Sequence, residues 1–146
     1  MELNIQKISF ETFGETIKLV MLYYKEHHKE KLHRIEAEEL LKEKNNICYL
    51  LLINGQPNGM FVYEKTSEVF LLKMFVLSPL VRKTKKGLQL WNFMIKLFEG
   101  KPAIFGVNRN NEYISNFVKK RAKFIGSYLN ISNTPIDYYN LTFKEQ

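Results

Sequence analysis

The sequence predicts an α/β domain built on a mixed, mostly antiparallel twisted sheet of about seven strands, with helices on both faces. Short apolar runs alternate with segments of helical periodicity, in the order strand, two helices, three strands, helix, strand, helix, two strands. The strand–helix–strand unit in the second half implies one parallel pairing, and the hairpin signals elsewhere imply antiparallel ones. With 146 residues, 45% of them hydrophobic and 14% aromatic, the chain suits one packed core, so we expect a single domain over residues 1–146.

The first third of the chain predicts a short strand followed by two helices. Leu3 and Ile5 alternate with polar neighbours, as in a strand. The segment 10–29 carries an apolar stripe at helical spacing, with Thr12 near the expected helix start. The highly charged segment 34–44 predicts a second helix with few apolar residues to face a core.

A three-strand meander is expected next. The apolar segment 47–53 predicts a strand, and Asn54-Gly55 after it is a strong hairpin signal. Segment 59–63 then predicts the second strand. After a turn at Lys65-Thr66-Ser67, the apolar segment 68–77 predicts a third, buried strand.

A basic loop separates this strand from the next helix. Pro79 stops the strand, and Gly87 is expected to open a helix whose apolar residues recur at helical spacing. A helix start carries unpaired amide N–H groups and a partial positive charge, so a lysine-rich loop at that point predicts a phosphate cradle. The basic residues of the loop are Arg82, Lys83, Lys85 and Lys86.

The C-terminal third predicts a strand, a helix and a closing pair of strands. Segment 103–107 is a short apolar strand, and the loop 108–111 ends in an asparagine suited to cap a helix. Segments 124–131 and 137–143 predict the closing strands, joined at Asn133-Thr134-Pro135. The helix between is lined by Tyr113, Ile114, Phe117 and Val118.

The element order and the basic loop resemble the GNAT superfamily of N-acetyltransferases over nearly the whole chain. The run Leu77-Ser78-Pro79-Leu80-Val81-Arg82 matches the family's valine-x-proline-x-x-arginine strand end, with leucine for valine. The family's cofactor signature is similar to Arg82-Lys83-Thr84-Lys85-Lys86-Gly87, in which Lys85 replaces the first glycine. The family's asparagine-led helix motif resembles residues 111–124, with Val118 in place of the usual tyrosine.

The resemblance implies that acetyl-coenzyme A binds against the fourth strand, with its pantetheine arm beside the strand and its pyrophosphate on the loop amides. A left-handed backbone at Lys85, a residue with a Cβ in a glycine's place, would cost about 1–2 kcal/mol. Asn111 is expected to contact the pantetheine arm, to cap the helix, or to do both. The implied cofactor-binding residues are Met74, Phe75, Val76, Leu77, Arg82, Lys83, Thr84, Lys85, Lys86, Gly87, Leu88 and Asn111.

Acetyl transfer to an amine needs a proton acceptor for the amine, donors for the oxyanion and a proton for the leaving thiolate. The candidate bases are Glu64 and Glu68, which would otherwise be solvated turn carboxylates. Because Val118 cannot donate a proton, tyrosines elsewhere are the candidate acids, and the alternative for each is a core or rim aromatic. They are Tyr128, Tyr138 and Tyr139 on the closing strands, because Tyr113 lies more than one turn away from Val118 along the helix.

The net charge of +7 favours an anionic partner. A second basic cluster at residues 119–123 could join the basic loop as a funnel for cofactor phosphates or as a nucleic-acid contact.

The N-terminus lacks a signal-peptide pattern, no apolar run is long enough to span a membrane, and the single cysteine, Cys48, lies in an apolar run where a buried thiol is expected. These features predict a cytoplasmic protein without a membrane partner. His27, His28 and His33 lie among charged residues, and we expect no metal site there.

The sequence therefore favours an acetyl-coenzyme A-dependent N-acyltransferase that acts by direct transfer in a ternary complex. Its acceptor would be an amine-bearing small molecule or protein, and the chain would be a monomer or homodimer. The alternatives are a non-catalytic binding or interaction protein of the same fold, and a basic protein that binds or modifies nucleic acid.

Overall fold

A computed structural model describes residues 3–8, 13–27, 39, 41–42, 45–129 and 133–142. Most of the helix expected at 34–44 lies outside these residues, as do Thr12, His28, His33 and the expected strand residue Ile131. The strands are β1 (Leu3–Lys7), β2 (Asn46–Ile53), β3 (Gln56–Lys65), β4 (Phe70–Leu77), β5 (Ala103–Asn108), β6 (Lys123–Leu129) and β7 (Pro135–Asn140). The helices are α1 (Phe13–His27), α3 (Lys85–Leu97) and α4 (Glu112–Lys119).

The strands form one seven-stranded sheet in the order β1-β2-β3-β4-β5-β7-β6. Among the strands that the structure describes, only β4 and β5 pair in parallel, and α3 is the crossover between them. All other neighbours are antiparallel. The predicted fold class, a mixed and mostly antiparallel sheet with one parallel pair, is thus confirmed.

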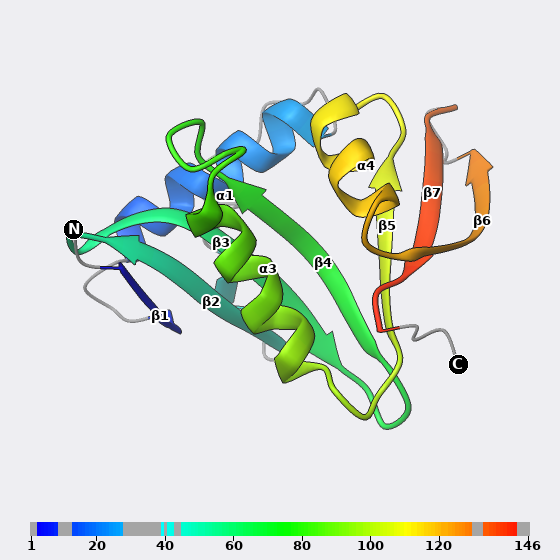
Figure 1. Cartoon of the computed structure of the whole chain (residues 1–146), viewed down its shortest axis with the longest axis horizontal. Coiled ribbons are helices and arrows are strands. Elements are labelled where there is room, and N and C mark those ends of the chain that lie inside the picture. Colours follow the sequence, from blue (N-terminus) through cyan, green and yellow to red (C-terminus); the bar gives the residue numbers. More distant parts are fainter. Residues whose placement is uncertain are drawn as a thin grey trace.

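Helices cover both faces of the sheet, and each face has its own apolar core (Figure 1). The helix α1 packs over β3 and β4 on one face, whereas α3 and α4 lie on the other. Alternation along each strand supplies both cores, since successive side chains point to opposite faces. The core under α3 and α4 is rich in aromatic rings, among them Phe61, Phe75, Trp91, Phe98 and Phe105.

The meander β2-β3-β4 forms as the sequence predicts. Asn54 and Gly55 join β2 to β3 with positive φ angles of 52° and 79°, the backbone that a tight hairpin turn of this type requires. The thiol of Cys48 is buried in β2, as expected for a free cysteine in an apolar run.

The strands β4 and β5 diverge along their length. They pair only at Phe70↔Ala103, Leu71↔Ile104 and Leu72↔Phe105, whereas β4 continues to Leu77 against β3 alone. Figure 1 shows the two strands close together at one end and separated at the end where α4 lies. A register shift in the β3–β4 pairing falls at the same level, where the Tyr23 hydroxyl donates a hydrogen bond of 3.3 Å to the Lys73 carbonyl. The second half of β4 therefore has an edge that β5 does not cover.

The helix α3 begins at Lys85, two residues before the predicted start at Gly87. Thr84 is the cap residue: its backbone is extended, with φ −114° and ψ 164°, and its Oγ1 accepts a hydrogen bond of 3.5 Å from the Gly87 N–H. A threonine at this position satisfies one of the unpaired amides of the first turn. Gly87 is therefore the third helical residue, and the expectation that it opens the helix is wrong.

The last strand is shorter than expected. It ends at Asn140, where the Asn140 side chain accepts hydrogen bonds from the backbone N–H and the hydroxyl of Thr142 and the chain enters a turn. Residue 143, the predicted end, lies outside the described residues.

Candidate active site

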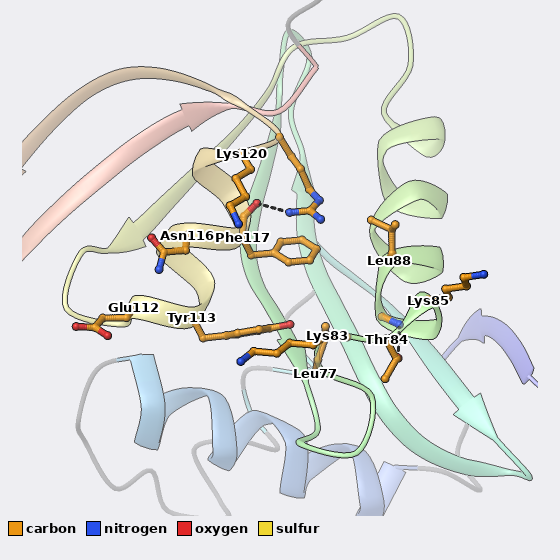
Figure 2. Close-up of a pocket in the computed structure, with 12 residues that line it drawn as sticks. Leu77, Lys83, Thr84, Lys85, Leu88, Glu112, Tyr113, Asn116, Phe117 and Lys120 are labelled. Atoms are coloured by element: carbon orange, nitrogen blue, oxygen red, sulfur yellow. Dashed lines mark hydrogen bonds between the residues drawn. The ribbon is translucent and has the colours of Figure 1, made fainter.

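A pocket of about 680 Å³ lies between the start of α3 and the helix α4, at the open end of β4 (Figure 2). Its floor and one wall come from the β4–α3 loop and the first turn of α3, and α4 supplies the opposite wall. It is lined by Leu77, Lys83, Thr84, Lys85, Gly87, Leu88, Glu112, Tyr113, Asn116, Phe117, Lys120 and Arg121.

The loop before α3 is a series of tight turns. Successive hydrogen bonds run from the Val81 N–H to the Ser78 carbonyl (3.1 Å) and from the Thr84 N–H to the Val81 carbonyl (3.3 Å). The Thr84 hydroxyl also donates to the Val81 carbonyl at 2.6 Å. The left-handed residue of the loop is Lys83, with φ 59°, whereas Lys85 is helical. The expectation of a left-handed backbone cost at Lys85 is therefore corrected, and the cost belongs to Lys83.

Charge and backbone polarity in this pocket both favour an anion. The pocket wall contains four cationic side chains against one carboxylate, that of Glu112. The first turn of α3 has no acidic residue, and the Lys85 N–H, at the first helical position, has no acceptor within the helix. A helix N-terminus with such donors and a partial positive charge is suited to bind phosphate. The cations are Lys83, Lys85, Lys120 and Arg121.

Gly87 sets how closely α3 approaches the end of β4. A Cβ added at this residue would lie 2.8 Å from the Leu77 Cδ1 and 2.9 Å from the Val81 carbonyl oxygen. Both distances are shorter than ordinary van der Waals contact, so only glycine fits without a shift of the loop.

The opposite wall is one face of α4. Asn111 caps the helix, with its Oδ1 accepting a hydrogen bond of 3.3 Å from the Ile114 N–H, which confirms the expected cap. Phe117 stacks on Phe75 of β4 at a centroid distance of 5.9 Å. The Arg121 guanidinium lies 4.0 Å from the centre of the Phe117 ring and donates to the Phe117 carbonyl at 2.9 Å. Phe117 thus packs α4 against β4 and holds the Arg121 side chain in place.

A second, much smaller pocket of about 20 Å³ lies beside the first at the end of β4. Arg82 crosses this region: its Nε donates to the Leu77 carbonyl at 2.9 Å, and its guanidinium carbon lies 5.3 Å from the centre of the Tyr113 ring. The small pocket is lined by Tyr23, Phe75, Val76, Leu77, Arg82, Asn111, Tyr113 and Ile114.

The structure brings most of the predicted cofactor-binding residues together around these two pockets. The large pocket is lined by Leu77, Lys83, Thr84, Lys85, Gly87 and Leu88, and the small one by Phe75, Val76, Leu77, Arg82 and Asn111. Two predicted residues line neither pocket. Met74 is buried in the core under α1, and Lys86 lies beside the pocket without lining it.

The candidate catalytic residues lie elsewhere in the fold. Glu68 is exposed in the β3–β4 turn, at the opposite end of β4 from the pocket, which at roughly 3.3 Å per residue is about 25 Å along the strand. Glu64, at the same end of the sheet, pairs with Lys73 at 3.9 Å.

Tyr128 and Tyr138 form a pair on β6 and β7, with a centroid distance of 5.4 Å and hydroxyls 2.9 Å apart. Because Tyr139 belongs to the core under α3 and α4, strand alternation directs Tyr138 to the opposite face of the sheet. Burial and the hydrogen bond with Tyr128 raise the pKa of Tyr138 to about 12. The pair therefore does not line the pocket.

The sequence predicted a place for the basic end of α4 beside the basic loop, but not that Tyr113 and Phe117 of the same helix line the pocket. Val118, aligned with the family's tyrosine, is fully buried in the core, and its neighbour Phe117 faces the pocket instead. The spacing of Tyr113, Phe117 and Lys120 puts them on one face of a helix, which is the signal that could have identified this wall. Neither Val118 nor Phe117 can donate a proton.

The described residues contain no cluster of three or more metal-ligating side chains. No helix within the described ranges has both the length and the apolar character needed to cross a membrane.

Comparison with known proteins relates this geometry to one fold. No family model and no curated protein matches the sequence. Among solved structures, the chain is similar to the PaiA N-acetyltransferase from Thermoplasma acidophilum in complex with coenzyme A, with TM-score 0.70, 16% identity, and coverage of 96% of this chain and 99% of that one. It is also similar to the ribosomal-protein-S18-alanine N-acetyltransferase from Escherichia coli, with TM-score 0.73, 10% identity, and coverage of 99% and 97%.

A third similar structure is the aminoglycoside 6′-N-acetyltransferase from Enterococcus faecium, with TM-score 0.71, 13% identity, and coverage of 98% of this chain and 99% of that chain. At these identities the similarity establishes the fold. The resemblance inferred from the sequence is thus confirmed at the level of the fold, which is that of the acyl-CoA N-acyltransferases.

Proposed function

We propose that this chain, which has the fold of the GNAT N-acetyltransferases, is an acetyl-coenzyme A-dependent N-acyltransferase that passes the acetyl group directly to an amine in a ternary complex. The divergence of β4 from β5 carries the proposal, because it frees the edge of β4 beside a cationic pocket at a helix N-terminus. An extended amide-bearing arm can pair with such a strand edge while its phosphates lie on the helix start.

The residues of the large pocket fit a pyrophosphate. Lys83 and Lys85 would supply charge from the loop and the first residue of α3, and Lys120 and Arg121 from the end of α4 and just beyond it. The α3 N-terminus would supply backbone donors, and Gly87 lets α3 lie close to the end of β4, because no Cβ meets Leu77 and Val81. Hydrogen bonds from such groups to phosphate oxygens are strong because they are charge-assisted.

Bound acetyl-coenzyme A would supply an activated thioester at the open edge of β4. The chain's contribution would be to orient this group, with the β4 backbone from Phe75 to Leu77 on one side and the Phe117 ring on the other. Water at the opening between β4 and β5 would accept the proton of the amine. Glu68, the candidate base, lies at the far end of β4 from the pocket.

The acceptor would be an amine on a small molecule or a protein. The similar structures include an enzyme named for an aminoglycoside and one named for an alanine of a ribosomal protein. This chain shares the fold with both enzymes. The shared fold supports an amine acceptor and does not distinguish a small molecule from a protein.

Isothermal titration calorimetry with acetyl-coenzyme A tests the proposal. We expect binding, and we expect the double variant Lys83→Ala/Lys85→Ala to weaken it about tenfold, from roughly 0.7 kcal/mol for each partly exposed charge contact. The matched control is Lys7→Ala/Lys65→Ala, which removes the same charge far from the pocket and should change the affinity less than twofold. A folded wild-type protein that shows no binding at millimolar acetyl-coenzyme A would exclude the enzyme.

A second candidate, a binding protein of the same fold without catalytic activity, is favoured by one observation. The side chain that faces the pocket from the middle of α4 is Phe117, which has no proton to donate to a leaving thiolate. Release of free thiol from acetyl-coenzyme A in the presence of a panel of amines separates the two candidates. Tight binding with no thiol release above the rate without protein would favour the binding protein.

A further inference from the structure

The hydroxyl of Tyr113 is buried and has no hydrogen-bond partner among the described residues. Tyr113 lies in the first turn of α4, and its ring lines both the large and the small pocket. Figure 2 shows the ring reaching from α4 across to the β4–α3 loop, with the oxygen near Leu77 and Lys83. A buried polar atom without a partner costs about 1–3 kcal/mol, so its persistence points to a group that is bound there at other times.

The groups around this hydroxyl are hydrogen-bond donors and cations. The Lys83 backbone N–H is close by without making a hydrogen bond to it, and the guanidinium of Arg82 lies over the ring. Burial raises the pKa of Tyr113, while the Lys83 backbone, Arg82 and Arg121 act in the opposite direction. The hydroxyl therefore remains protonated near neutral pH, and what it lacks is an acceptor.

The missing acceptor is best matched by an anionic oxygen. Tyr113 lines the same pocket as Lys83, Thr84 and Lys85, which lie at the start of α3 on the opposite wall. An acceptor that satisfies a phenol O–H among cations and backbone N–H groups carries negative charge and several lone pairs, as a phosphate oxygen does.

We propose that the Tyr113 hydroxyl donates a hydrogen bond to a phosphate oxygen of the bound ligand, at the end of the pyrophosphate that faces the small pocket. This inference rests on the proposed coenzyme A site, in which the pantetheine arm would leave the pyrophosphate at this point. Arg82 is a positioning residue for this contact, because it holds the Tyr113 ring by stacking and is itself tied to the Leu77 carbonyl.

The test compares Tyr113→Phe with wild type by calorimetry, using coenzyme A and, as a competitor, inorganic pyrophosphate. The variant keeps the ring, its stack on Arg82 and its contact with Phe117, and loses only the hydroxyl. We expect the affinity for both probes to fall about tenfold, as for a hydrogen bond to a charged group. The matched control is Tyr49→Phe, which removes a hydroxyl from a ring on β2 and should leave both affinities within twofold.

The urea concentration at the unfolding midpoint shows whether the Tyr113 hydroxyl has a purely structural role. It should be unchanged or higher in Tyr113→Phe, because a buried hydroxyl without a partner has been removed. Affinities equal to wild type for both probes would overturn the inference and leave the coenzyme A site standing. A loss for coenzyme A with none for pyrophosphate would overturn the assignment to a phosphate oxygen. If the wild-type protein binds no coenzyme A, both the proposed coenzyme A site and the proposed Tyr113 contact are overturned.

Discussion

Gly87 is the residue at which helix propensity and packing impose opposite requirements. In an exposed helix, replacing glycine by alanine stabilises the protein by up to about 1 kcal/mol. Here the added Cβ would meet the Leu77 side chain and the Val81 carbonyl oxygen at 2.8 and 2.9 Å. The backbone oxygen cannot move without the loop, so the steric effect outweighs the gain in helix propensity.

Glycine-to-alanine replacement in a helix usually raises the free energy of unfolding. We expect Gly87→Ala to lower it instead, by about 1–3 kcal/mol. Urea denaturation monitored by circular dichroism measures it. Gln89→Ala, an exposed position two residues on, is the control and should lie within about 0.5 kcal/mol of wild type. A Gly87→Ala protein more stable than wild type would contradict the close approach of α3 to β4.

The left-handed backbone of Lys83 makes a second prediction at the scale of one residue. Lys83→Gly and Lys83→Ala remove the same charge, but only glycine adopts φ 59° without steric cost. We expect the glycine variant to unfold with a free energy about 1 kcal/mol higher than the alanine variant. Both should lower the affinity for coenzyme A to the same degree. Equal stabilities would mean that the loop has another conformation in solution.

At this scale the sequence predicted the residue types better than their conformations. The spacing from Arg82 to Gly87 indicated the basic loop that lines the pocket, because charge and glycine content can be read directly. Which residue of the loop takes the left-handed conformation depends on which N–H groups bond to the Ser78 and Val81 carbonyls. Lys83 rather than Lys85 takes that conformation for this reason. This pattern of hydrogen bonds cannot be read from the residue types.

The helix α4 is the element that carries the second wall of the pocket. Only eight residues long, it depends on its cap, since short helices are marginal on their own. The Asn111 side chain satisfies the Ile114 N–H, and Ile114 and Val118 anchor the helix in the core. The positions of Tyr113 and Phe117 follow from this anchoring.

Asn111→Ala should therefore lower the free energy of unfolding by about 1 kcal/mol and weaken coenzyme A binding, because the first turn of α4 frays. Its neighbour Asn110 is the matched control: it is exposed and lies outside the helix. Asn110→Ala should change the unfolding free energy by less than about 0.5 kcal/mol. If the two variants are equally stable, the cap does not hold the pocket wall.

Most elements could be predicted because their signals are local. The Asn54-Gly55 turn, the β4–loop–α3 order and the cap at Asn111 each depend on a few neighbouring residues. The divergence of β4 from β5 could not be predicted, because it depends on pairing between segments about thirty residues apart that ends after Leu72. Phe117 rather than Val118, the residue aligned with the family's tyrosine, faces the pocket, because one residue along a helix rotates the side chain by about 100°.

On the scale of the whole molecule, the excess positive charge is partly concentrated at one site. The basic loop and the basic end of α4 are far apart in sequence, yet both contribute cations to the same pocket. The convergence supports the funnel for cofactor phosphates over an extended nucleic-acid surface as the use of this charge. If these cations contact a few cofactor phosphates, we expect coenzyme A binding to weaken moderately as the salt concentration rises.

The pH dependence of global stability gives a prediction that does not depend on any ligand. Cys48 is in the core between the sheet and α1, and burial raises the pKa of its thiol from 9.0 to about 12. Below pH 9 the thiol is protonated in both the folded and unfolded states and contributes no pH dependence. As the pH rises above 9 the unfolded state loses its proton first, so the free energy of unfolding falls until about pH 12.

From pH 8 to pH 10, ionisation of this thiol in the unfolded state should lower the free energy of unfolding by about 1.4 kcal/mol in wild type. Cys48→Ala lacks this ionisation, and because Tyr138 and the other tyrosines are present in both proteins, their contributions cancel in the comparison. Urea titrations of both proteins at pH 8, 9 and 10 measure the difference in slope. Parallel pH profiles would show that the thiol ionises as readily in the folded protein as in the unfolded chain, which a core packed between α1 and the sheet does not permit.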